Sequence, residues 1–508
     1  MAQSLPLHAT IAVVGTGAMG AGIAQVAAAA GHTVKLMDNR PQAAQAAVAS
    51  IRAQFARLAE KGKLTQEAAH AASSRLVAVA TQSELADASL VIEAIVENLQ
   101  AKQDLYRGLE DIVGDDCIFG TNTSSISVTA IGAALKHSGR LAGLHFFNPA
   151  PLMALVEVVS GLATDPHVAE TLFATAHAWG KTPVHAKSTP GFIVNRVARP
   201  YYGEALRLLT EGAADCATID VVMREAGGFR MGPFELMDMI GHDINFAVTC
   251  SVWSAFYNDP RFLPSLVQQE LVNAGFLGKK SGRGFYDYQP GATKPEPQTE
   301  SPYPLPAEIF ICGESSAANA LAQRLTAANV VFQREVSLDG RIAQAGDAVV
   351  FVTDGRSATQ RASESGLSNT VVIDLALDYT QATRLAMAAS AQCTEAAAND
   401  AAALLQACRV QVARFADVPG LAVMRTVCML ANEAADAVNQ GVCSTLAADS
   451  AMLLGVNYPR GPLLWADQIG LRAVRDVLAN LGASYGEDRY RISPLISQHV
   501  FAGSSIYR

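Results

Sequence analysis

The segment TIAVVGTGAMGAGIA, residues 10–24, is the strongest indication of the fold of the first half of the chain. A run of apolar and β-branched residues ends in the pattern Gly-x-Gly-x-x-Gly, and an alanine-rich helical pattern follows directly. The three glycines permit a tight turn, a close approach of the backbone to a pyrophosphate, and close packing of the helix on the strand. The helix start also offers N–H groups to phosphates. The segment therefore predicts a dinucleotide site, with the phosphates held at Gly15, Gly17, Ala18, Met19 and Gly20.

The next apolar run, TVKLMD at 33–38, ends in an acid that indicates which dinucleotide binds. Asp38 can accept hydrogen bonds from the adenine ribose hydroxyls and would repel a 2′-phosphate, which favours NAD over NADP. Arg40 argues for the opposite choice, because a guanidinium near the ribose can accommodate that phosphate. A structural alternative is a glycine turn followed by a capping acid. We expect NAD as the cofactor.

Strand and helix signals alternate through the first half of the chain. The strand candidates are continuous apolar runs, which suits strands buried on both faces of a mostly parallel sheet. They lie at residues 10–15, 33–38, 75–80, 89–96, 117–120, 140–147 and 155–159. We therefore predict an α/β fold with a Rossmann-like, doubly wound sheet. From about Thr189 to residue 288 the pattern is helical, and six prolines between Gln289 and Pro306 indicate a linker.

A sequence repeat relates the two halves of the chain. Residues 190–241 align without a gap with residues 419–470 at an offset of 229, and 14 of the 52 pairs are identical. Many of the shared residues are Gly, Pro, Asp and Glu, which an alanine-rich composition does not explain. Apolar runs at 308–313, 348–354 and 370–377 predict a second Rossmann-like domain ahead of the repeated segment. We interpret the second half as a diverged copy of the first.

The second copy lacks residues that the first would use for binding and chemistry. Ser315 and Ala318 replace the second and third glycines of the fingerprint, and their side chains would obstruct a pyrophosphate. Met424 aligns with Asn195. We therefore predict no second nucleotide and a single active site. The predicted domains are an NAD-binding Rossmann-like domain (1–188), a helical domain (189–288), the proline-rich linker (289–306), a degenerate Rossmann-like domain (307–412) and a second, non-catalytic helical domain (413–508).

Composition excludes several classes of function. The 38 basic and 47 acidic residues give a net charge of −9, which argues against a nucleic-acid binder. No run approaches the roughly 18 apolar residues of a membrane helix. The eight cysteines show no CxxC pair and no histidine at zinc spacing, so we expect reduced thiols and no metal site. A strand pattern begins near Ile11 with no signal segment before it, and we expect a soluble, cytoplasmic protein.

Two polar side chains among apolar strands are candidates for acid–base chemistry. His145 follows LAGL at the end of a predicted strand, where parallel sheets present residues to ligands. An imidazole titrates near neutrality, so it can take a hydroxyl proton as hydride leaves for a nicotinamide. Glu157 lies in the next apolar strand, an unfavourable place for an unpaired carboxylate. A hydrogen bond from Glu157 to the far ring nitrogen would fix the tautomer and stabilise the imidazolium. A purely structural histidine is the alternative.

Six longer motifs widen this prediction to a family. They are EAIVENLQAK (93–102), TNTSSIS (121–127), GLHFFNPAPLMALVEVV (143–159), TPGFIVNR (189–196), MGPFELMD (231–238) and GKKSGRGFY (278–286). Together they resemble the L-3-hydroxyacyl-CoA dehydrogenases of β-oxidation, closely over residues 10–288 and more loosely beyond. The resemblance implies NAD-dependent oxidation of an L-3-hydroxyacyl-CoA to the 3-oxoacyl-CoA, with His145 as the catalytic base and Glu157 as its carboxylate partner. It also implies that Ser124 bonds the 3-oxygen of the substrate and that Asn195 binds the acyl thioester region.

The resemblance also implies contacts with CoA and with the cofactor. Arg52, Arg57, Lys61 and Lys63, against Glu60, give a local charge of +3 in an acidic chain. In the family this helix pair lies over the CoA nucleotide, where Ser50, Arg57 and Lys61 are candidates for the phosphates; a solvated helix face is the alternative. The family's cofactor-lining positions are matched by Glu97, Lys102 and Asn122. The first two could equally be ordinary surface charges.

Competing functions differ in substrate or in class. Long bacterial members with one active site resemble 3-hydroxyadipyl-CoA dehydrogenases of phenylacetate breakdown, or 3-hydroxybutyryl-CoA dehydrogenases. A β-hydroxyacid dehydrogenase of the phosphogluconate type would use a lysine base, and the lens crystallin relatives are non-catalytic NAD-binding structural proteins. The set His145, Glu157, Ser124 and Asn195 argues against both of the latter. We expect a monofunctional enzyme that binds an acyl-CoA and has no nucleic-acid or membrane partner.

The repeat also suggests how the helical domains associate. Family dimers form through these domains, so we expect residues 413–508 to pack on residues 189–288 as an internal pseudo-partner that closes the active cleft. Homodimerisation of the whole chain is a further expectation.

Overall fold

The computed structural model describes residues 3–507, which form two compact units. Unit 1 contains the chain up to Arg196 together with Gln440–Val456, and unit 2 contains Val197–Asn439 together with the chain from Asn457 onward. Each unit therefore combines segments from both halves of the sequence. The division into four consecutive domains stays a prediction.

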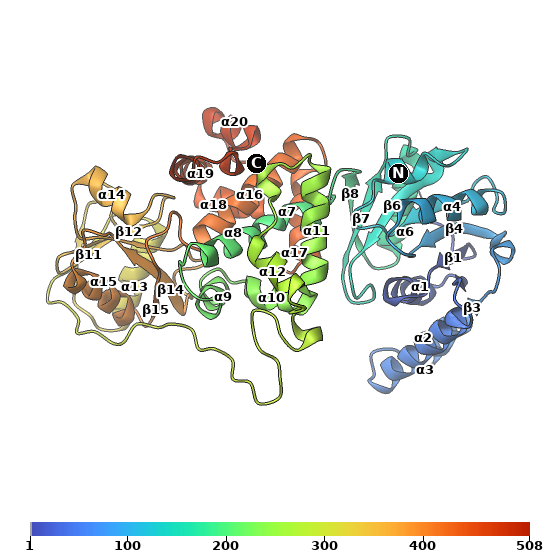
Figure 1. Cartoon of the computed structure of the whole chain (residues 1–508), viewed down its shortest axis with the longest axis horizontal. Coiled ribbons are helices and arrows are strands. Elements are labelled where there is room, and N and C mark those ends of the chain that lie inside the picture. Colours follow the sequence, from blue (N-terminus) through green and yellow to red (C-terminus); the bar gives the residue numbers. More distant parts are fainter. Residues whose placement is uncertain (1–2, 508) are drawn as a thin grey trace. The chain divides into compact units, whose positions relative to one another are not determined.

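Unit 1 is built on one eight-stranded sheet with the strand order β3-β2-β1-β4-β5-β6-β7-β8 (Figure 1). All neighbouring strands are parallel except β6 and β7, which are antiparallel. The order reverses beside β1, which is where doubly wound sheets bind nucleotides. The strands are β1 (Thr10–Val14), β2 (Val34–Met37), β3 (Leu76–Ala78), β4 (Ala88–Glu93), β5 (Ile118–Thr121), β6 (Leu141–Phe146), β7 (Leu155–Ser160) and β8 (Thr182–Lys187).

The predicted Rossmann-like sheet of the first half is thus confirmed, and its core strands are fully buried as their apolar runs predict. One strand, β8, was not anticipated, since Pro183, His185 and Lys187 interrupt its apolar pattern. The helices of unit 1 are α1 (Ala18–Ala30), α2 (Ala43–Glu60), α3 (Gln66–Ser74), α4 (Leu99–Glu110), α5 (Val128–Gly132), α6 (Pro166–Ala178), the start of α7 (Val194–Val197), and α17 (Thr445–Gly455). Helices α2 and α3 pack on each other as a projecting pair (Figure 1).

Unit 2 contains the second sheet, with the strand order β10-β9-β11-β12-β13-β14-β15. Its pair β13–β14 is antiparallel and β14–β15 is parallel, which repeats the arrangement of β6, β7 and β8. The strands are β9 (Ile309–Cys312), β10 (Gln333–Glu335), β11 (Ala343–Ala345), β12 (Ala348–Val352), β13 (Thr370–Ile373), β14 (Arg384–Ala389) and β15 (Gln411–Arg414), accompanied by α13 (Ser316–Ala327), α14 (Ala358–Ser365) and α15 (Glu395–Ala407).

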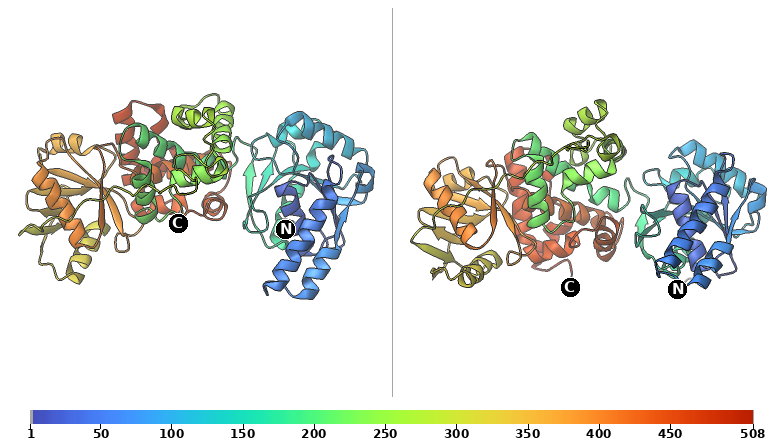
Figure 2. Two further views of the ribbon diagram at one scale, coloured as in Figure 1. Left: turned by 60° about the horizontal axis from the view of Figure 1, so that its bottom comes forward. Right: turned by 90° about the horizontal axis from the view of Figure 1, so that it is seen from below.

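The helices of unit 2 come from both repeats and interleave (Figure 2). Helix α8 packs on α16, and buried Arg425 of α16 lies 2.6 Å from Glu204 and 2.9 Å from Glu211. The expected packing of the second helical repeat on the first is present in these contacts. The helices are α8 (Arg199–Thr210), α9 (Cys216–Glu225), α10 (Pro233–Ile240), α11 (His242–Ala255), α12 (Leu266–Asn273), α16 (Val423–Asn439), α18 (Pro462–Ile469), α19 (Leu471–Tyr485) and α20 (Pro494–Ala502).

One helix of each repeat also packs on the sheet of the other repeat. In unit 1, α17 of the second repeat packs on β7, and the Lys187 amide donates to the Val442 carbonyl at 2.9 Å. In unit 2, α9 of the first repeat packs on β14, and the Ala416 amide donates to the Ala213 carbonyl at 2.9 Å. Residues 187 and 416 differ by the repeat offset, as do 213 and 442. The contacts are therefore reciprocal, as in an interface between two copies of one subunit.

Across residues 3–507, every helix is too short or too polar to cross a membrane. In the same range no cluster of three His, Cys, Asp or Glu side chains is arranged to hold a metal ion, and all eight cysteines are free.

Candidate active site

The glycine fingerprint forms the predicted turn between β1 and α1. Gly15 has a φ of +93°, and a Cβ there would lie 2.5 Å from the Ala94 carbonyl oxygen. A Cβ on Gly20 would lie 1.8 Å from the Gly15 oxygen, so the helix packs on the turn only because that atom is absent. A Cβ on Gly17 would meet nothing within 4 Å, and Gly17 caps α1 without a side chain. The protein packs tightly around Gly15 and Gly20 and leaves free space at Gly17, where a pyrophosphate would approach the backbone. These residues therefore fit the cofactor.

Asp38 lies at the end of β2 with its carboxylate directed at the same turn. It accepts hydrogen bonds from the Thr16 amide at 2.8 Å and from the Thr16 hydroxyl at 2.7 Å. The Arg40 guanidinium donates two bonds to it at 3.0 Å and holds the pKa of Asp38 well below its usual range. Arg40 is the residue that would accommodate the 2′-phosphate of NADP, and its guanidinium is bonded to Asp38, the residue that favours NAD.

A groove of about 1340 Å³ runs from this turn along α2. It brings together Gly17 and Ala18 at one end and the three predicted CoA contacts, Ser50, Arg57 and Lys61. Arg40 and Lys63 also line the groove, so its charged wall is basic. Guanidinium and ammonium groups on the wall of an elongated groove match the phosphates of a nucleotide.

His145 and Glu157 meet directly across the antiparallel pair β6–β7. They occupy opposite positions in the strand register, and the His145 Nδ1 lies 2.6 Å from Glu157 Oε2. His145 is 5% exposed and Glu157 is fully buried. The rings of Phe147 and Phe192 lie 4.6 and 5.8 Å from the imidazole, measured between ring centroids. The imidazole is therefore oriented by a carboxylate within an apolar setting.

The second oxygen of Glu157 connects this pair to the turn before α7. Glu157 Oε1 accepts hydrogen bonds from the Ile193 and Val194 amides, both at 3.0 Å. The next residue, Asn195, donates from its side-chain nitrogen to the Ser124 carbonyl at 3.4 Å. The four predicted catalytic residues thus lie on connected elements of unit 1. Asn195 is part-buried in this contact.

Lys102 lies in a buried charge network that the sequence did not reveal. Its Nζ lies 2.9 Å from Glu93 and 3.3 Å from Glu97, and its side chain is 1% exposed, so it is not a surface charge. Glu97 accepts bonds from the Thr123 hydroxyl at 2.6 Å and the Ser124 amide at 3.0 Å. Burial would raise the pKa of Glu97, but Lys102 and these donors outweigh it and lower the pKa. The network positions the backbone of the Ser124 turn.

Glu93 is the member of this network that sequence reasoning missed. Its signal was an acid at the end of the apolar strand β4, the same kind of signal that singled out Glu157. Asn122, a predicted cofactor contact, accepts a hydrogen bond from the Phe146 amide at 2.8 Å through its side-chain oxygen. It therefore holds the end of β5 against β6, next to His145.

Comparisons with known proteins agree with this geometry. Residues 10–189 match the family model described as 3-hydroxyacyl-CoA dehydrogenase, NAD binding domain, and residues 191–288 and 420–505 match its C-terminal domain. Residues 350–419 match a 3-hydroxybutyryl-CoA dehydrogenase reduced Rossmann-fold domain. The repeated match to one C-terminal domain model supports the duplication inferred from the sequence.

Two relatives differ in how much of the chain they match. The chain is 44% identical to an Escherichia coli K12 protein named 3-hydroxyadipyl-CoA dehydrogenase, over 97% of this chain and 98% of the relative. A probable 3-hydroxybutyryl-CoA dehydrogenase of Bacillus subtilis is 42% identical over 55% of this chain and 97% of its own length. The shorter relative thus corresponds to about the first half.

A solved structure resembles the whole chain. It is a 3-hydroxybutyryl-CoA dehydrogenase from Escherichia coli K12, with 44% identity, a TM-score of 0.89, and coverage of 97% of this chain and 98% of that one. The architecture of two halves is therefore shared. On these matches and the nucleotide fold, the chain belongs to the 3-hydroxyacyl-CoA dehydrogenase family and is an NAD-dependent oxidoreductase.

Proposed function

We propose that the enzyme oxidises an L-3-hydroxyacyl-CoA to the 3-oxoacyl-CoA with His145 as the acid–base residue and Glu157 as its partner. The observation that carries this proposal is the 2.6 Å contact between His145 and Glu157, which leaves the other ring nitrogen for the substrate. When bound, NAD accepts the hydride from C3. His145 takes the hydroxyl proton at Nε2, while Glu157 holds the proton on Nδ1 and stabilises the imidazolium.

Ser124 and Asn195 are proposed to hold the substrate. Ser124 would donate a hydrogen bond to the 3-oxygen, and Asn195 would bind the thioester region. Their support is the 3.4 Å contact between Asn195 and the Ser124 backbone, which couples the two positions. Ser50, Arg57 and Lys61 would meet the phosphates of CoA, since they line one groove with the fingerprint.

The substrate is proposed to be 3-hydroxyadipyl-CoA, in the breakdown of phenylacetate. Support comes from the relative of that name, which matches both halves of the chain. A 3-hydroxybutyryl-CoA dehydrogenase is the second candidate, favoured by the name of the solved structure with the same coverage.

The second half is proposed to bind no nucleotide. Its fingerprint turn keeps a glycine at Gly313, with a φ of +74°, but Ser315 caps α13 by accepting a hydrogen bond from the Ala318 amide at 3.2 Å. In unit 1, α1 has no such side-chain cap at Gly17. A helix start already satisfied by a serine offers less to a pyrophosphate.

The test is the loss of NADH absorbance with acetoacetyl-CoA, followed by kcat/KM for 3-hydroxybutyryl-CoA and 3-hydroxyadipyl-CoA in the forward direction. We expect turnover with both thioesters and a preference for the dicarboxylic one. No turnover with any thioester would contradict the reaction, and a preference for the four-carbon thioester would assign the second candidate. Titration with NADH should give one site per chain.

A further inference from the structure

A small pocket in unit 2, separate from the groove of the fingerprint, is lined by four arginines. It has a volume of about 310 Å³ and lies between α8, the turn after α19 that carries Arg489, and the segment that leads into α12. We call it the arginine pocket; its charged lining is Arg199, Arg207, Arg261, Arg489 and Glu211. Four cations face one acid in a protein whose net charge is −9.

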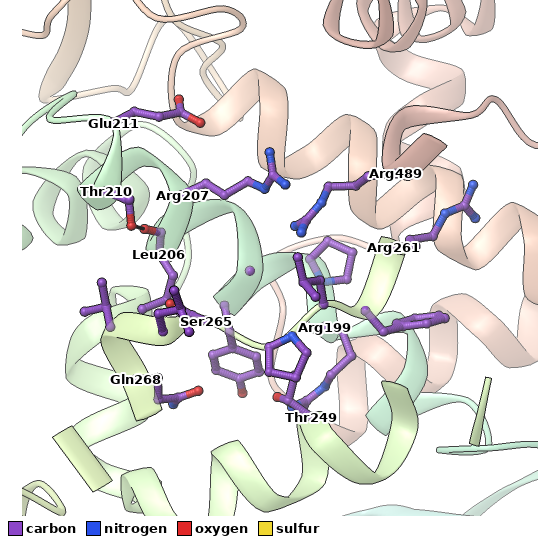
Figure 3. A pocket seen from close by; sticks show the side chains of 18 residues that line it. Arg199, Leu206, Arg207, Thr210, Glu211, Thr249, Arg261, Ser265, Gln268 and Arg489 are labelled. Atoms are coloured by element: carbon purple, nitrogen blue, oxygen red, sulfur yellow. Dashed lines mark hydrogen bonds between the residues drawn. The ribbon is translucent and has the colours of Figure 1, made fainter. Parts of the chain in front are cut away.

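Three of the four arginines are buried, and two of the four are directed at each other. Arg489 and Arg261 are 4% exposed and Arg199 is 7% exposed. Figure 3 shows the guanidinium groups of Arg207 and Arg489 pointing toward one another across the pocket. Burial lowers the pKa of Arg489; the Glu204 carboxylate opposes this shift, and the nearby Arg207 charge adds to it. Like charges at this distance repel in a low-dielectric site unless an anion lies with them.

Acidic partners occupy only part of these guanidinium groups. Arg261 is paired with Glu433 at 3.1 Å and with Asp436, and Arg207 lies 2.5 Å from Glu487. The nearest contact of Arg489 to a carboxylate, by contrast, is 3.7 Å. Among the residues that the structure describes, the buried Nε–H groups of Arg207, Arg261 and Arg489 have no hydrogen-bond partner. Buried donors of this kind are ordinarily satisfied. The three Nε atoms are themselves inaccessible, so they show that the guanidinium groups are incompletely satisfied and do not mark direct ligand contacts.

The acid on the wall is already engaged. Glu211 accepts hydrogen bonds from Arg425 at 2.9 Å and from the Tyr485 hydroxyl at 2.8 Å. Glu487 neutralises Arg207, so Arg489 is the buried guanidinium of the pocket whose nearest carboxylates, Glu204 and Glu487, lie beyond hydrogen-bond distance. A carboxylate in the pocket would give Arg489 a direct acidic partner.

The remaining wall is apolar and limits what can enter. It is formed by Leu206, Phe262, Leu263, Leu266 and Val267, with prolines on either side. Drug-sized and cofactor sites span about 300–1,000 Å³, so this pocket lies at the small end and has no room for a nucleotide. Guanidinium groups pair with carboxylates in a planar, two-point geometry. We propose that the arginine pocket binds a carboxylate carried on a short aliphatic chain.

The occupant that we propose is a free short-chain acid, and this proposal does not depend on the proposed function. Calorimetric titration of the full-length protein with adipate, at constant ionic strength, tests the free acid. We expect saturable binding that weakens at least tenfold in Arg489→Met and is unchanged in Arg472→Met, an exposed arginine of α19. Acetate should bind more weakly than adipate, because it lacks the chain that the apolar wall would cover.

Adipate binding that is lost in Arg489→Met and kept in Arg472→Met would support the proposal. No saturable adipate binding by the full-length protein would overturn it. Turnover of acetoacetyl-CoA by the unaltered enzyme reports on the proposed function separately. Should Arg489→Met not fold by circular dichroism, Arg207→Met, whose side chain is 18% exposed, replaces it.

Discussion

Asp374 stands in the second repeat at the position that His145 occupies in the first, 229 residues earlier. His145 lies opposite Glu157 in the register of β6 and β7. The Asp374 amide likewise bonds the carbonyl of Ala386 at 2.9 Å, and Ala386 is 229 residues after Glu157. Asp374 and Ala386 therefore stand in the second repeat where His145 and Glu157 stand in the first, and the second repeat has no histidine at this position to move a proton.

The helix turn that Glu157 holds is nevertheless retained in the second repeat. Asp374 accepts hydrogen bonds from the Ala422, Val423 and Met424 amides at 2.9, 2.8 and 3.0 Å. The first two of these correspond to the amides of residues 193 and 194, which Glu157 holds in unit 1. A carboxylate therefore caps this turn in both repeats. In the first repeat it is Glu157 of β7, and in the second it is Asp374, which follows β13, the counterpart of β6. The second repeat therefore lacks the pair that we propose to be catalytic but keeps the backbone geometry around it.

The first prediction concerns the pH dependence of stability at Asp374. Burial raises its pKa to about 6, although the backbone amides oppose that rise. A carboxyl with a raised pKa in the folded state binds its proton more tightly there than in the unfolded chain. Stability is then highest below the unfolded pKa near 4 and falls as pH rises toward 6. A shift of this size corresponds to about 3 kcal/mol.

Urea unfolding of the native protein and Asp374→Asn at pH 4, 5, 6 and 7, followed by circular dichroism, measures this effect. The stability of the native protein relative to the variant should fall across that range and level off above pH 6.5. The difference between the two proteins isolates Asp374 from the other carboxyls. A difference that stays constant from pH 4 to pH 7 would refute the assignment.

Much of the first half was predictable because its signals are local. The fingerprint turn depends on glycines that nothing else replaces, and the buried strands are continuous apolar runs, so both can be identified without tertiary information. His145 and Glu157 were identifiable because polar groups in apolar strands need partners. Strand β8 was missed because Pro183 and His185 break its pattern.

Other features depend on tertiary context and could not be predicted. The correspondence of Asp374 with His145 involves β-strands of small and apolar residues, where identity is low and only the hydrogen-bond register reveals the match. The burial of Lys102 depends on Glu93, which lies nine residues away on another element. The placement of α17 in unit 1 reflects a contact between segments more than 250 residues apart, for which no local signal exists.

The second prediction tests the proposed roles of His145 as catalytic base and of Glu157 as its partner. His145→Gln should lose about 10²–10⁴-fold in turnover, the usual contribution of general acid–base catalysis. Glu157→Gln should lose turnover as well, because the imidazolium loses its carboxylate. NADH binding, measured by fluorescence, should survive in both, since neither residue lies at the fingerprint turn. Near-normal turnover of His145→Gln would reject its role.

The third prediction concerns cofactor choice at Asp38. In Asp38→Ser, Arg40 loses its partner and becomes available to a 2′-phosphate, while the ribose hydroxyls lose an acceptor. A charge-assisted hydrogen bond is worth about 1.5–3 kcal/mol, so the ratio of the Kd values for NADPH and NADH should fall by roughly 10–100-fold. Fluorescence titration with each reduced cofactor gives the ratio. The double variant with Arg40→Ala serves as control and should abolish the gain in NADPH binding; an unaltered ratio in Asp38→Ser would contradict the role of this acid.

The fourth prediction tests the basic wall of the groove. Arg57→Met should raise KM for acetoacetyl-CoA about tenfold, because one charge-assisted contact to a phosphate is removed. The rise should disappear with acetoacetyl-N-acetylcysteamine, a thioester that lacks the nucleotide. Arg107→Met is a matched control, since Arg107 is 50% exposed and pairs with Asp104 on the surface of α4. Equal effects of Arg57→Met on both thioesters would exclude a phosphate contact.

The fifth prediction concerns Gly455, the last residue of α17. A Cβ there would lie 2.7 Å from the Leu155 side chain and 3.0 Å from that of Val194. Leu155 begins the strand that carries Glu157, and the Val194 amide is one of the donors to Glu157. Gly455→Ala should therefore displace the partner of His145. A shift of about 1 Å remote from the reacting atoms can cost up to about 100-fold in rate.

If α17 positions Glu157, Gly455→Ala should lower the turnover of the folded enzyme and not only the amount of folded protein. Turnover per NADH-binding site should fall in Gly455→Ala, and Leu155→Val in the same chain should restore much of it by removing the crowded methyl group. Gly482→Ala, on a helix where the nearest atom to a new Cβ is 3.8 Å away, should leave turnover unchanged. Stopped-flow measurement of hydride transfer, normalised to bound NADH, separates the two explanations. If turnover per bound NADH were normal in Gly455→Ala, α17 would support the fold of unit 1 without orienting Glu157, and the second repeat would have no part in the chemistry of the first.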